Sequence, residues 1–226
     1  MKTYPMFAQI EGLPVLVVGG GAVGERKVLD LLAAGAVVTV ASPEITAGLA
    51  ELARQGAIRH LPQEFFPELV EDMALVVGAT DDHEVNTGIS QAARSRGIFV
   101  NIVDQPELCT FIVPAQVRRG ELTIAVSTGG ASPALARKIR ERLEEVFGPE
   151  YGPYLELLQG VRERLLAVRR GHPDNARLFG RLVECPLRPA LARDDGQELV
   201  RLLMEACGEV LNAQDLKDLV EQTLAR

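Results

Sequence analysis

A glycine-rich segment near the start of the chain has the spacing of a dinucleotide-binding turn. The segment Gly19-Gly20-Gly21-Ala22-Val23-Gly24 fits G-x-G-x-x-G, follows an apolar run and precedes a helical pattern. In that context the glycines permit a tight turn, close approach of a pyrophosphate, and close helix–strand packing, and the helix N-terminus faces the phosphates. The alternative is a glycine-rich turn without a ligand. We predict that the cofactor-binding residues are Gly19, Gly21, Ala22, Val23 and Gly24.

The residues that would hold the adenosine ribose are less typical. An acidic residue is expected about 20 positions after the glycines, but the second apolar run ends in Ala41-Ser42-Pro43-Glu44. No Arg or Lys lies between Gly35 and Glu51, and Glu44 would repel a 2′-phosphate. These features favour NAD over NADP. The predicted cofactor contacts here are Ser42, Pro43 and Glu44, with Thr80, Asp81 and Asp82 after a later strand.

Asp104 is the candidate for proton transfer. It follows the run Ile98–Val103, the fifth predicted strand, and ligands of open α/β sheets bind at the carboxyl ends of strands. Asn101 lies on the same strand and is a candidate substrate contact. The alternative is that Asp104 is a turn residue before Gln105-Pro106, and its placement alone leaves both interpretations open.

The elements that position these residues alternate between strands and helices. This alternation predicts an α/β fold with a Rossmann-type parallel sheet. We predict a short helical turn over Glu68–Asp72, helices over Ala22–Ala34 and Glu84–Arg96, and a helix that opens at Pro43 and ends at Gly56. The predicted strands are Leu13–Gly19, Ala36–Ala41, Ala57–Leu61, Ala74–Thr80 and Ile98–Val103.

The pattern changes after Asp104. Strands are predicted over Phe111–Val117 and Leu122–Ser127, followed by a helix over Pro133–Phe147 that Ser132 caps. Gly148-Pro149 and Gly152-Pro153 should break the chain, and the sequence is helical in character from Tyr154. The predicted domains are a NAD-binding Rossmann domain over 1–113, a small α+β dimerisation segment over 114–148 and a C-terminal helical domain over 149–226. The middle segment is too short for a core of its own, so we expect a homodimer.

Composition excludes several classes of protein. The net charge of −7 disfavours non-specific nucleic-acid binding, and no apolar stretch is long enough to cross a membrane. The three Cys and three His residues form no metal-binding motif, so we expect no metal site. The amino-terminal residues show no signal peptide, and the expected location is cytoplasmic.

Five segments occur together with characteristic order and spacing. They are Val18–Lys27 (VGGGAVGERK), Gly78–Asp82 (GATDD) with Asn86, Asn101–Asp104 (NIVD), Phe111–Ala115 (FIVPA) and Val126–Pro133 (VSTGGASP). Over about residues 4–147 the chain resembles precorrin-2 dehydrogenase, the dehydrogenase–ferrochelatase part of siroheme synthase. The resemblance implies oxidation of precorrin-2, a tetrapyrrole, to sirohydrochlorin with NAD⁺, and it makes Asp104 the essential catalytic residue.

A carboxylate-rich substrate requires cations and N–H donors. Arg118, Arg119, Arg137, Lys138 and Arg140 cluster in the second segment, and the loop from Ser127 to Ser132 leads into a helix N-terminus. The alternative is a solvated helix face with Arg137–Glu141 and Arg140–Glu144 ion pairs. The predicted substrate contacts are Asn101, Ser127, Thr128, Gly129, Arg137 and Lys138. Members of the family can have Ser-Ser where this chain has Ser127-Thr128, so regulation that requires a serine there is in doubt.

Two other functions stay open at this stage. The first is a bifunctional enzyme that also inserts Fe²⁺ into sirohydrochlorin, with Asp104 taking part in both reactions. The second is a non-catalytic module that binds NAD as a signal. Such a module needs the glycine turn but neither Asp104 nor the loop over 127–133, so the presence of both disfavours it.

Overall fold

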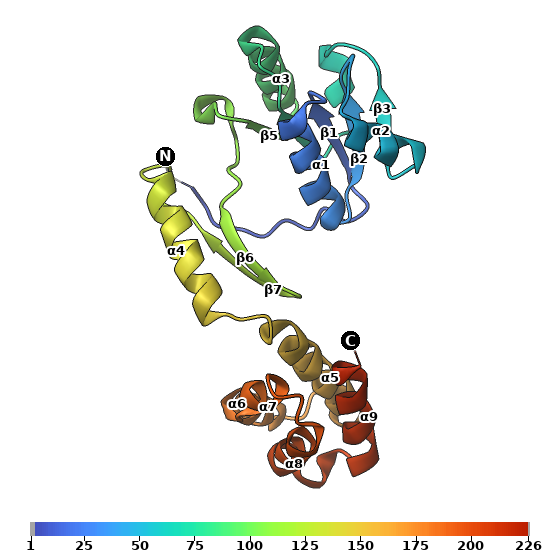
Figure 1. The fold of residues 1–226 in the computed structure, drawn as a ribbon, viewed down its shortest axis with the longest axis vertical. Helices are drawn as coiled ribbons and strands as arrows, with labels where there is room; N and C mark the ends of the chain where they lie inside the picture. Colours follow the sequence, from blue (N-terminus) through green and yellow to red (C-terminus); the bar gives the residue numbers. More distant parts are fainter. Residues whose placement is uncertain (1–2, 226) are drawn as a thin grey trace. The chain divides into compact units, whose positions relative to one another are not determined.

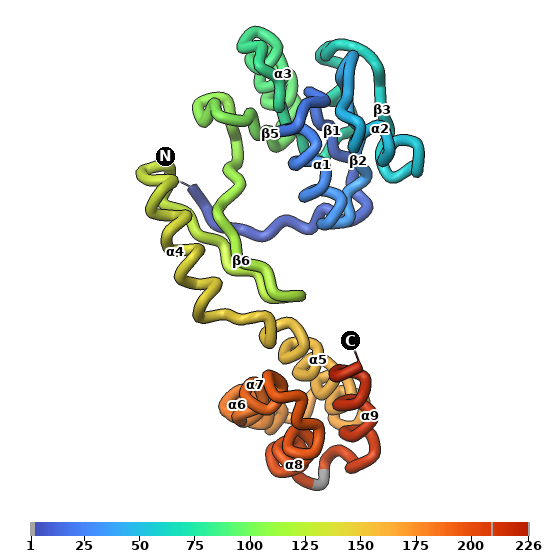
Figure 2. The backbone as a smooth tube through the Cα atoms, in the orientation of Figure 1, coloured from blue at the N-terminus to red at the C-terminus, as the bar shows by residue number. Residues whose placement is uncertain are grey.

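The computed structural model describes residues 3–225, apart from the side chain of residue 209. Contacts divide the chain into two compact units, Met1–Val113 and Pro114–Arg226. Figures 1 and 2 show the elements of each unit. A separate dimerisation segment over 114–148 stays a proposal, because residues on both sides of position 148 belong to the second unit.

The first unit contains a parallel sheet with the order β3-β2-β1-β4-β5. Its central strand, β1, pairs with β2 and β4, so that Val15 lies opposite both Val38 and Leu75. This is the α/β Rossmann-type fold that the alternating pattern predicts. The bounds of the strands are Pro14–Val18 for β1, Val37–Ala41 for β2, Ile58–Leu61 for β3, Leu75–Gly78 for β4 and Phe99–Ile102 for β5.

Helices cover both faces of this sheet, which explains why β1 is apolar at every position. Val15 and Val17 face the core formed with α1 (Ala22–Ala33) and α2 (Ala47–Arg54). Leu16 and Val18 face the opposite core, formed with α3 (His83–Ser95) and the 3₁₀ turn η1 (Pro67–Val70). A second 3₁₀ turn, η2 (Pro106–Leu108), follows β5. Burial on both faces is typical of parallel strands.

The second helix begins later than predicted. Pro43 was expected to open it, but α2 begins at Ala47, and Thr46 is its N-cap. The Thr46 hydroxyl oxygen accepts a hydrogen bond from the Leu49 N–H over 3.2 Å, which is the ordinary function of an N-cap threonine. Residues 42–46 are therefore a loop at the carboxyl edge of the sheet.

The second unit begins with a hairpin and a helix. Strands β6 (Ala115–Arg119) and β7 (Leu122–Val126) are antiparallel, and α4 (Pro133–Val146) packs on them. The Ser132 hydroxyl accepts from the Leu135 N–H over 3.2 Å and caps α4 as predicted. The prediction of a strand from Phe111 was wrong, since the Phe111 carbonyl accepts from the Asn101 side chain of the first unit and only the residues after Pro114 pair with β7.

The rest of the unit is a bundle of helices (Figure 1). Its core consists mainly of buried leucines. The predicted break at Gly152-Pro153 was wrong, since both residues lie in the first turn of α5. Proline is tolerated there because the N–H groups of the first turn have no hydrogen-bond partner within the helix. Within the described residues, no helix combines the length and apolarity needed to span a membrane. The helices are α5 (Tyr151–Arg169), α6 (Asn175–Glu184), α7 (Leu187–Leu191), α8 (Gly196–Cys207) and α9 (Ala213–Leu224), with the 3₁₀ turn η3 (Gly208–Val210) before α9.

Candidate functional site

Two glycines of the fingerprint are required by the fold itself. Gly19 has a φ of +108°, and a Cβ atom there would lie 2.4 Å from the Ala79 carbonyl oxygen. A Cβ atom on Gly24 would lie 2.1 Å from the Gly19 carbonyl oxygen. The first glycine therefore permits the turn, and the last lets α1 pack closely on it, as the spacing predicts.

Gly21 has a different environment. It is the N-cap of α1 with φ −76° and ψ −176°, and a Cβ atom there would meet no atom of the described residues within 4 Å. Among the described residues no side chain caps the helix, and the next two residues, Ala22 and Val23, are exposed. The turn thus presents backbone N–H groups and the positive end of a helix dipole to open space, as an anion-binding helix N-terminus does.

The loop over residues 42–46 is fastened to the glycine turn. The Thr46 N–H donates to the Gly20 carbonyl over 3.0 Å, and the Thr46 hydroxyl donates to the Glu25 carboxylate on α1 over 2.6 Å. A Cβ atom on Gly20 would lie 2.3 Å from the Glu44 carbonyl oxygen, so only glycine fits this contact. Sequence reasoning missed Gly20, Glu25 and Thr46, because their partners are distant in the chain.

Within this loop, the predicted adenosine contacts differ in availability. The Ser42 hydroxyl donates to the Glu44 carbonyl over 2.6 Å, and the His60 ring Nε2 donates to the Ser42 carbonyl over 2.9 Å. Pro43 and Glu44 are exposed. The loop is therefore fixed by internal hydrogen bonds, and the Glu44 side chain is its most accessible polar group.

The turn after β4 lies at the same edge of the sheet. The Thr80 hydroxyl donates to Asn86 Oδ1 over 3.0 Å, while Asn86 Nδ2 donates to the Thr80 carbonyl over 2.9 Å. Asn86 is fully buried, so this pair fixes the turn. The Asp82 carboxylate caps α3 by accepting from the Glu84 and Val85 N–H groups. Asp81 is exposed and, within the described residues, its carboxylate has no such partner.

Asp104 follows β5 at this edge. It has a φ of +60°, is exposed, and within the described residues its carboxylate makes no hydrogen bond or ion pair. The Val103 N–H donates to the Gly78 carbonyl at the end of β4, and the Ala79 N–H donates to the Val18 carbonyl at the end of β1. The glycine turn, the turn after β4 and Asp104 thus follow three adjacent strands.

Asn101 does not share this exposure. Its side chain is buried, and Nδ2 donates to the Phe111 carbonyl over 3.1 Å and lies 3.6 Å from Cys109 Sγ. The structure thus gives Asn101 a function within the fold, holding the chain that returns along β5.

In the second unit, the side-chain hydroxyls of the predicted substrate loop form hydrogen bonds with the backbone of the same loop. The Ser127 oxygen accepts from the Gly129 N–H over 3.1 Å, and the Thr128 hydroxyl contacts both the N–H and the carbonyl of Ser132. Gly129 and Gly130 have φ values of +62° and +86°. The loop therefore has a defined shape ahead of the N-terminus of α4.

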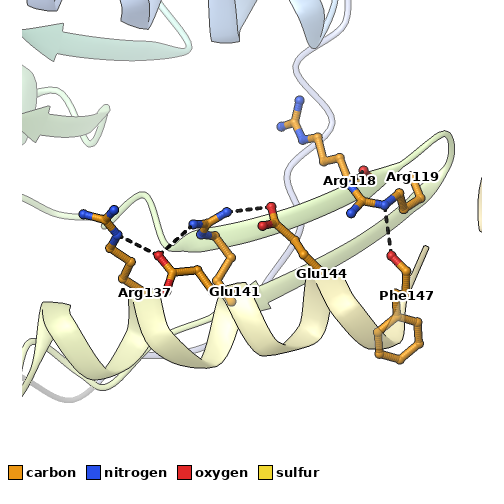
Figure 3. Close-up of polar contacts among 7 residues, drawn as sticks. Arg118, Arg119, Arg137, Glu141, Glu144 and Phe147 are labelled. Carbon is orange, nitrogen blue, oxygen red and sulfur yellow. Dashed lines mark hydrogen bonds and ion pairs between the residues drawn. The ribbon is translucent and has the colours of Figure 1, made fainter. Parts of the chain in front are cut away.

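The basic residues around this loop fall into two groups. Arg137 and Arg140 pair with Glu141 and Glu144 over 2.9 and 2.6 Å, as the helical spacing predicts (Figure 3). Arg119 donates to the Phe147 carbonyl over 2.9 Å. By contrast, Arg118 and Lys138 are exposed, and their side chains have no acidic partner among the residues that the structure describes. These two side chains are the more available cations of the set.

No metal centre is evident in the part of the chain that the structure describes. It contains no group of three or more His, Cys, Asp or Glu side chains placed to hold a metal ion. Cys109 and Cys207 are buried and Cys185 is partly buried, all three as free thiols. Burial raises the pKa of the Cys207 thiol to about 11, so this group is protonated at neutral pH.

Comparison with known proteins gives matches to both units. Residues 6–115 match the family described as putative NAD(P)-binding, and residues 119–145 match the family described as sirohaem biosynthesis protein central. Siroheme synthase from Methylobacillus flagellatus is 50% identical over 72% of the chain and 35% of its own length. Siroheme synthase from Methylococcus capsulatus is 40% identical over 91% of the chain and 44% of its own length. The chain thus spans less than half of these relatives.

A solved structure titled SirC, precorrin-2 dehydrogenase, matches over 90% of the chain and 100% of its own length. Its TM-score is 0.75 and its sequence identity 26%. Together with the parallel five-stranded sheet, this match confirms the predicted fold class. The matches also confirm the resemblance that the five sequence segments indicated.

Proposed function

Because the chain is a homologue of siroheme synthases and has the fold of a precorrin-2 dehydrogenase, we propose that it oxidises precorrin-2 to sirohydrochlorin with NAD⁺. The observation that carries the proposal is the placement of Asp104. Its unpartnered carboxylate follows β5 at the sheet edge where the glycine turn follows β1. Ligands of open parallel sheets bind at this edge.

The residues at this edge fit a dinucleotide. The space beside Gly21 is open, and a side chain at this position would begin to fill it. The first turn of α1, which no described side chain caps, supplies N–H donors for a pyrophosphate. Exposed Glu44 would face an adenosine ribose and disfavour a 2′-phosphate. Asp81 is exposed and its carboxylate has no partner among the described residues, so it is our further candidate for a ribose contact. When bound, NAD⁺ supplies the acceptor for the hydride.

Asp104 then has a defined task. Oxidation of the macrocycle removes a hydride and a proton, so a base must take the proton as the hydride leaves. The Asp104 carboxylate is exposed and has no hydrogen-bonded partner in the described chain, so it is free to accept this proton. The substrate carboxylates require cations, for which Lys138 and Arg118 are our first choices because both lack an acidic partner among the described residues.

We also propose a homodimer built on α4. Leu135, Ile139 and Val146 are 50%, 38% and 59% exposed, and they recur along this helix with helical spacing. An isolated two-stranded hairpin is marginally stable in water, so the hairpin beneath α4 gains from further packing. Exposed apolar side chains in a row fit association with a second copy. The expected cytoplasmic location stays a prediction.

The test of the proposed activity is an absorbance assay with precorrin-2 and NAD⁺. Conversion to sirohydrochlorin that requires both the protein and NAD⁺ is the expected result. Binding of NAD⁺ without any turnover would support the alternative of a nucleotide-sensing module.

A second activity, insertion of Fe²⁺ into sirohydrochlorin, is favoured by the names of the relatives. They are siroheme synthases, and the exposed Asp104 carboxylate would equally accept pyrrole protons during metal insertion. Adding Fe²⁺ or Co²⁺ to sirohydrochlorin with and without the protein tests this activity separately. A rate no higher than that of the protein-free reaction would exclude it.

A further inference from the structure

The carboxylate of Asp104 is positioned by its backbone alone. Its side chain has no partner among the described residues, yet its φ of +60° lies in the left-handed region that non-glycine residues rarely adopt. The turn is closed by the Gln105 N–H, which donates to the Ile102 carbonyl over 3.4 Å. This hydrogen bond is long and by itself gives weak support to a residue that has to present a base at a fixed position. The residues beside Asp104 are held by the Val103 N–H, which donates to the Gly78 carbonyl, and by the Leu108 N–H, which donates to the Gln105 carbonyl over 3.1 Å.

The Cys109 thiol contacts this turn on both sides of Asp104. Its sulfur accepts from the Ile102 N–H over 3.2 Å. Its S–H lies within donating distance of two carbonyl oxygens, Ile102 at 3.2 Å and Gln105 at 3.3 Å. Burial raises the pKa of this thiol, which keeps the S–H donor in place at neutral pH. One buried atom therefore links the residues that precede and follow Asp104.

Two residues of α3 hold Cys109 in turn. The Arg94 guanidinium donates to the Glu107 and Cys109 carbonyls over 3.2 and 3.0 Å. The Ser90 hydroxyl donates to the Leu108 carbonyl over 2.7 Å and accepts from Arg94 Nε over 3.1 Å. Three successive carbonyls of the returning chain are thus bound to one helix, which fixes the position of Cys109 below the turn.

We propose that Cys109, held by Arg94 and Ser90, is a positioning residue that keeps Asp104 in its left-handed conformation at the edge of the sheet. This inference rests on the proposed function, in which Asp104 accepts a proton. Neither Cys109 nor Arg94 needs to touch the substrate. They affect turnover only by holding the backbone of the turn. Replacing them should therefore lower the rate only when residue 104 carries a carboxylate.

A double-mutant cycle tests this dependence. In the full chain, Cys109→Ala removes both kinds of contact. We expect kcat for precorrin-2 to fall about tenfold, less than the roughly hundredfold that a 1 Å misplacement can cost, because the rest of the turn stays in place. The KM for NAD⁺ should not change. Cys109→Ser retains a donor and an acceptor and should recover most of the rate. In an Asp104→Asn background, whose residual rate is measured in single turnovers, Cys109→Ala should cause no further loss.

Two further variants separate positioning from general damage. Cys207→Ala removes a buried thiol from the second unit and should leave kcat unchanged. Arg94→Met acts at the protein surface and should reproduce the Asp104-dependent loss if Cys109→Ala folds poorly. Amide hydrogen exchange should be faster at Ile102 and Gln105 in both Cys109→Ala and Arg94→Met.

The outcomes are distinguishable from a failure of the proposed function. A wild-type rate in both Cys109→Ala and Arg94→Met, or an equal loss with and without Asp104, would overturn the positioning inference alone. If the unmodified chain does not oxidise precorrin-2 at all, the proposed function fails and this inference fails with it.

Discussion

Replacement of Asp104 by asparagine removes the proposed base and keeps the shape of the side chain. A φ of +60° is tolerated best, after glycine, by Asp and Asn, so the backbone should not change. The carboxylate makes no hydrogen bond in the described chain, so its loss should alter the free energy of unfolding by no more than about 0.5 kcal/mol. Loss of a general base lowers turnover by about 10²–10⁴-fold, equivalent to about 3–5 kcal/mol of barrier.

The assay follows conversion of precorrin-2 by absorbance at saturating NAD⁺, alongside NAD⁺ affinity and the thermal unfolding midpoint. Asp104→Asn should lose turnover while both other quantities stay near wild type. Asp104→Ala provides a contrast, since alanine in the left-handed region costs about 1–2 kcal/mol and should lower the midpoint as well.

A variant Asp104→Asn that retains most of the wild-type rate would refute this assignment. The base would then be sought at Asp81, whose carboxylate is free among the described residues, before Asp82, whose carboxylate caps α3. A variant that fails to fold would show instead that Asp104 is a structural turn residue.

Three other predictions follow from the same geometry. Gly21→Val should fold normally, because a Cβ atom at this position meets no described atom within 4 Å, but it should weaken NAD⁺ binding more than about tenfold in calorimetry. The matched variant Gly24→Ala should instead lower the free energy of unfolding by about 1–3 kcal/mol, because its Cβ atom would clash with the Gly19 carbonyl oxygen. Wild-type affinity in Gly21→Val would refute the binding mode. Ile139→Asp should convert a dimer to monomers in sedimentation at micromolar concentration, and a monomeric wild type would refute the dimer. Lys138→Gln should raise the KM for precorrin-2 a few-fold, equivalent to about 1 kcal/mol of binding free energy. The matched change Arg137→Gln should have a smaller effect, because the Arg137 guanidinium already pairs with an acidic side chain. Equal effects would contradict the choice of Lys138 as the more available cation.

Much of the first unit was predictable because the determining interactions are local or periodic. The apolar run of β1 reflects burial on both faces, and the fingerprint glycines reflect steric limits within a single turn. The start of α2 was not predictable in the same way. Pro43 resembles a first helical residue, but Thr46 is the N-cap, and its hydroxyl also donates to Glu25, which lies on a different helix.

The site was predictable in its positions more than in its contacts. Placing Asp104 at the end of a strand needs only the strand pattern, while the burial of Asn101 depends on the chain that returns past it. The importance of Cys109 also depends on that return, since its partners are brought together by the fold. Such contacts carry no signal in a single sequence.

The strand order of the first unit has a consequence for how the chain folds. The central strand β1 is completed only when β4 pairs with it, and Val15 and Leu75 are far apart in the sequence. Contacts of high sequence separation form slowly, because a long loop must close before they are made. During synthesis the apolar residues of β1 leave the ribosome well before β4, so one edge of this strand stays unpaired in the meantime and is open to aggregation or to chaperones. In the second unit α8 packs on its neighbour in sequence, α9, but α5 also packs on α9, so the core of this unit likewise requires a contact of high sequence separation.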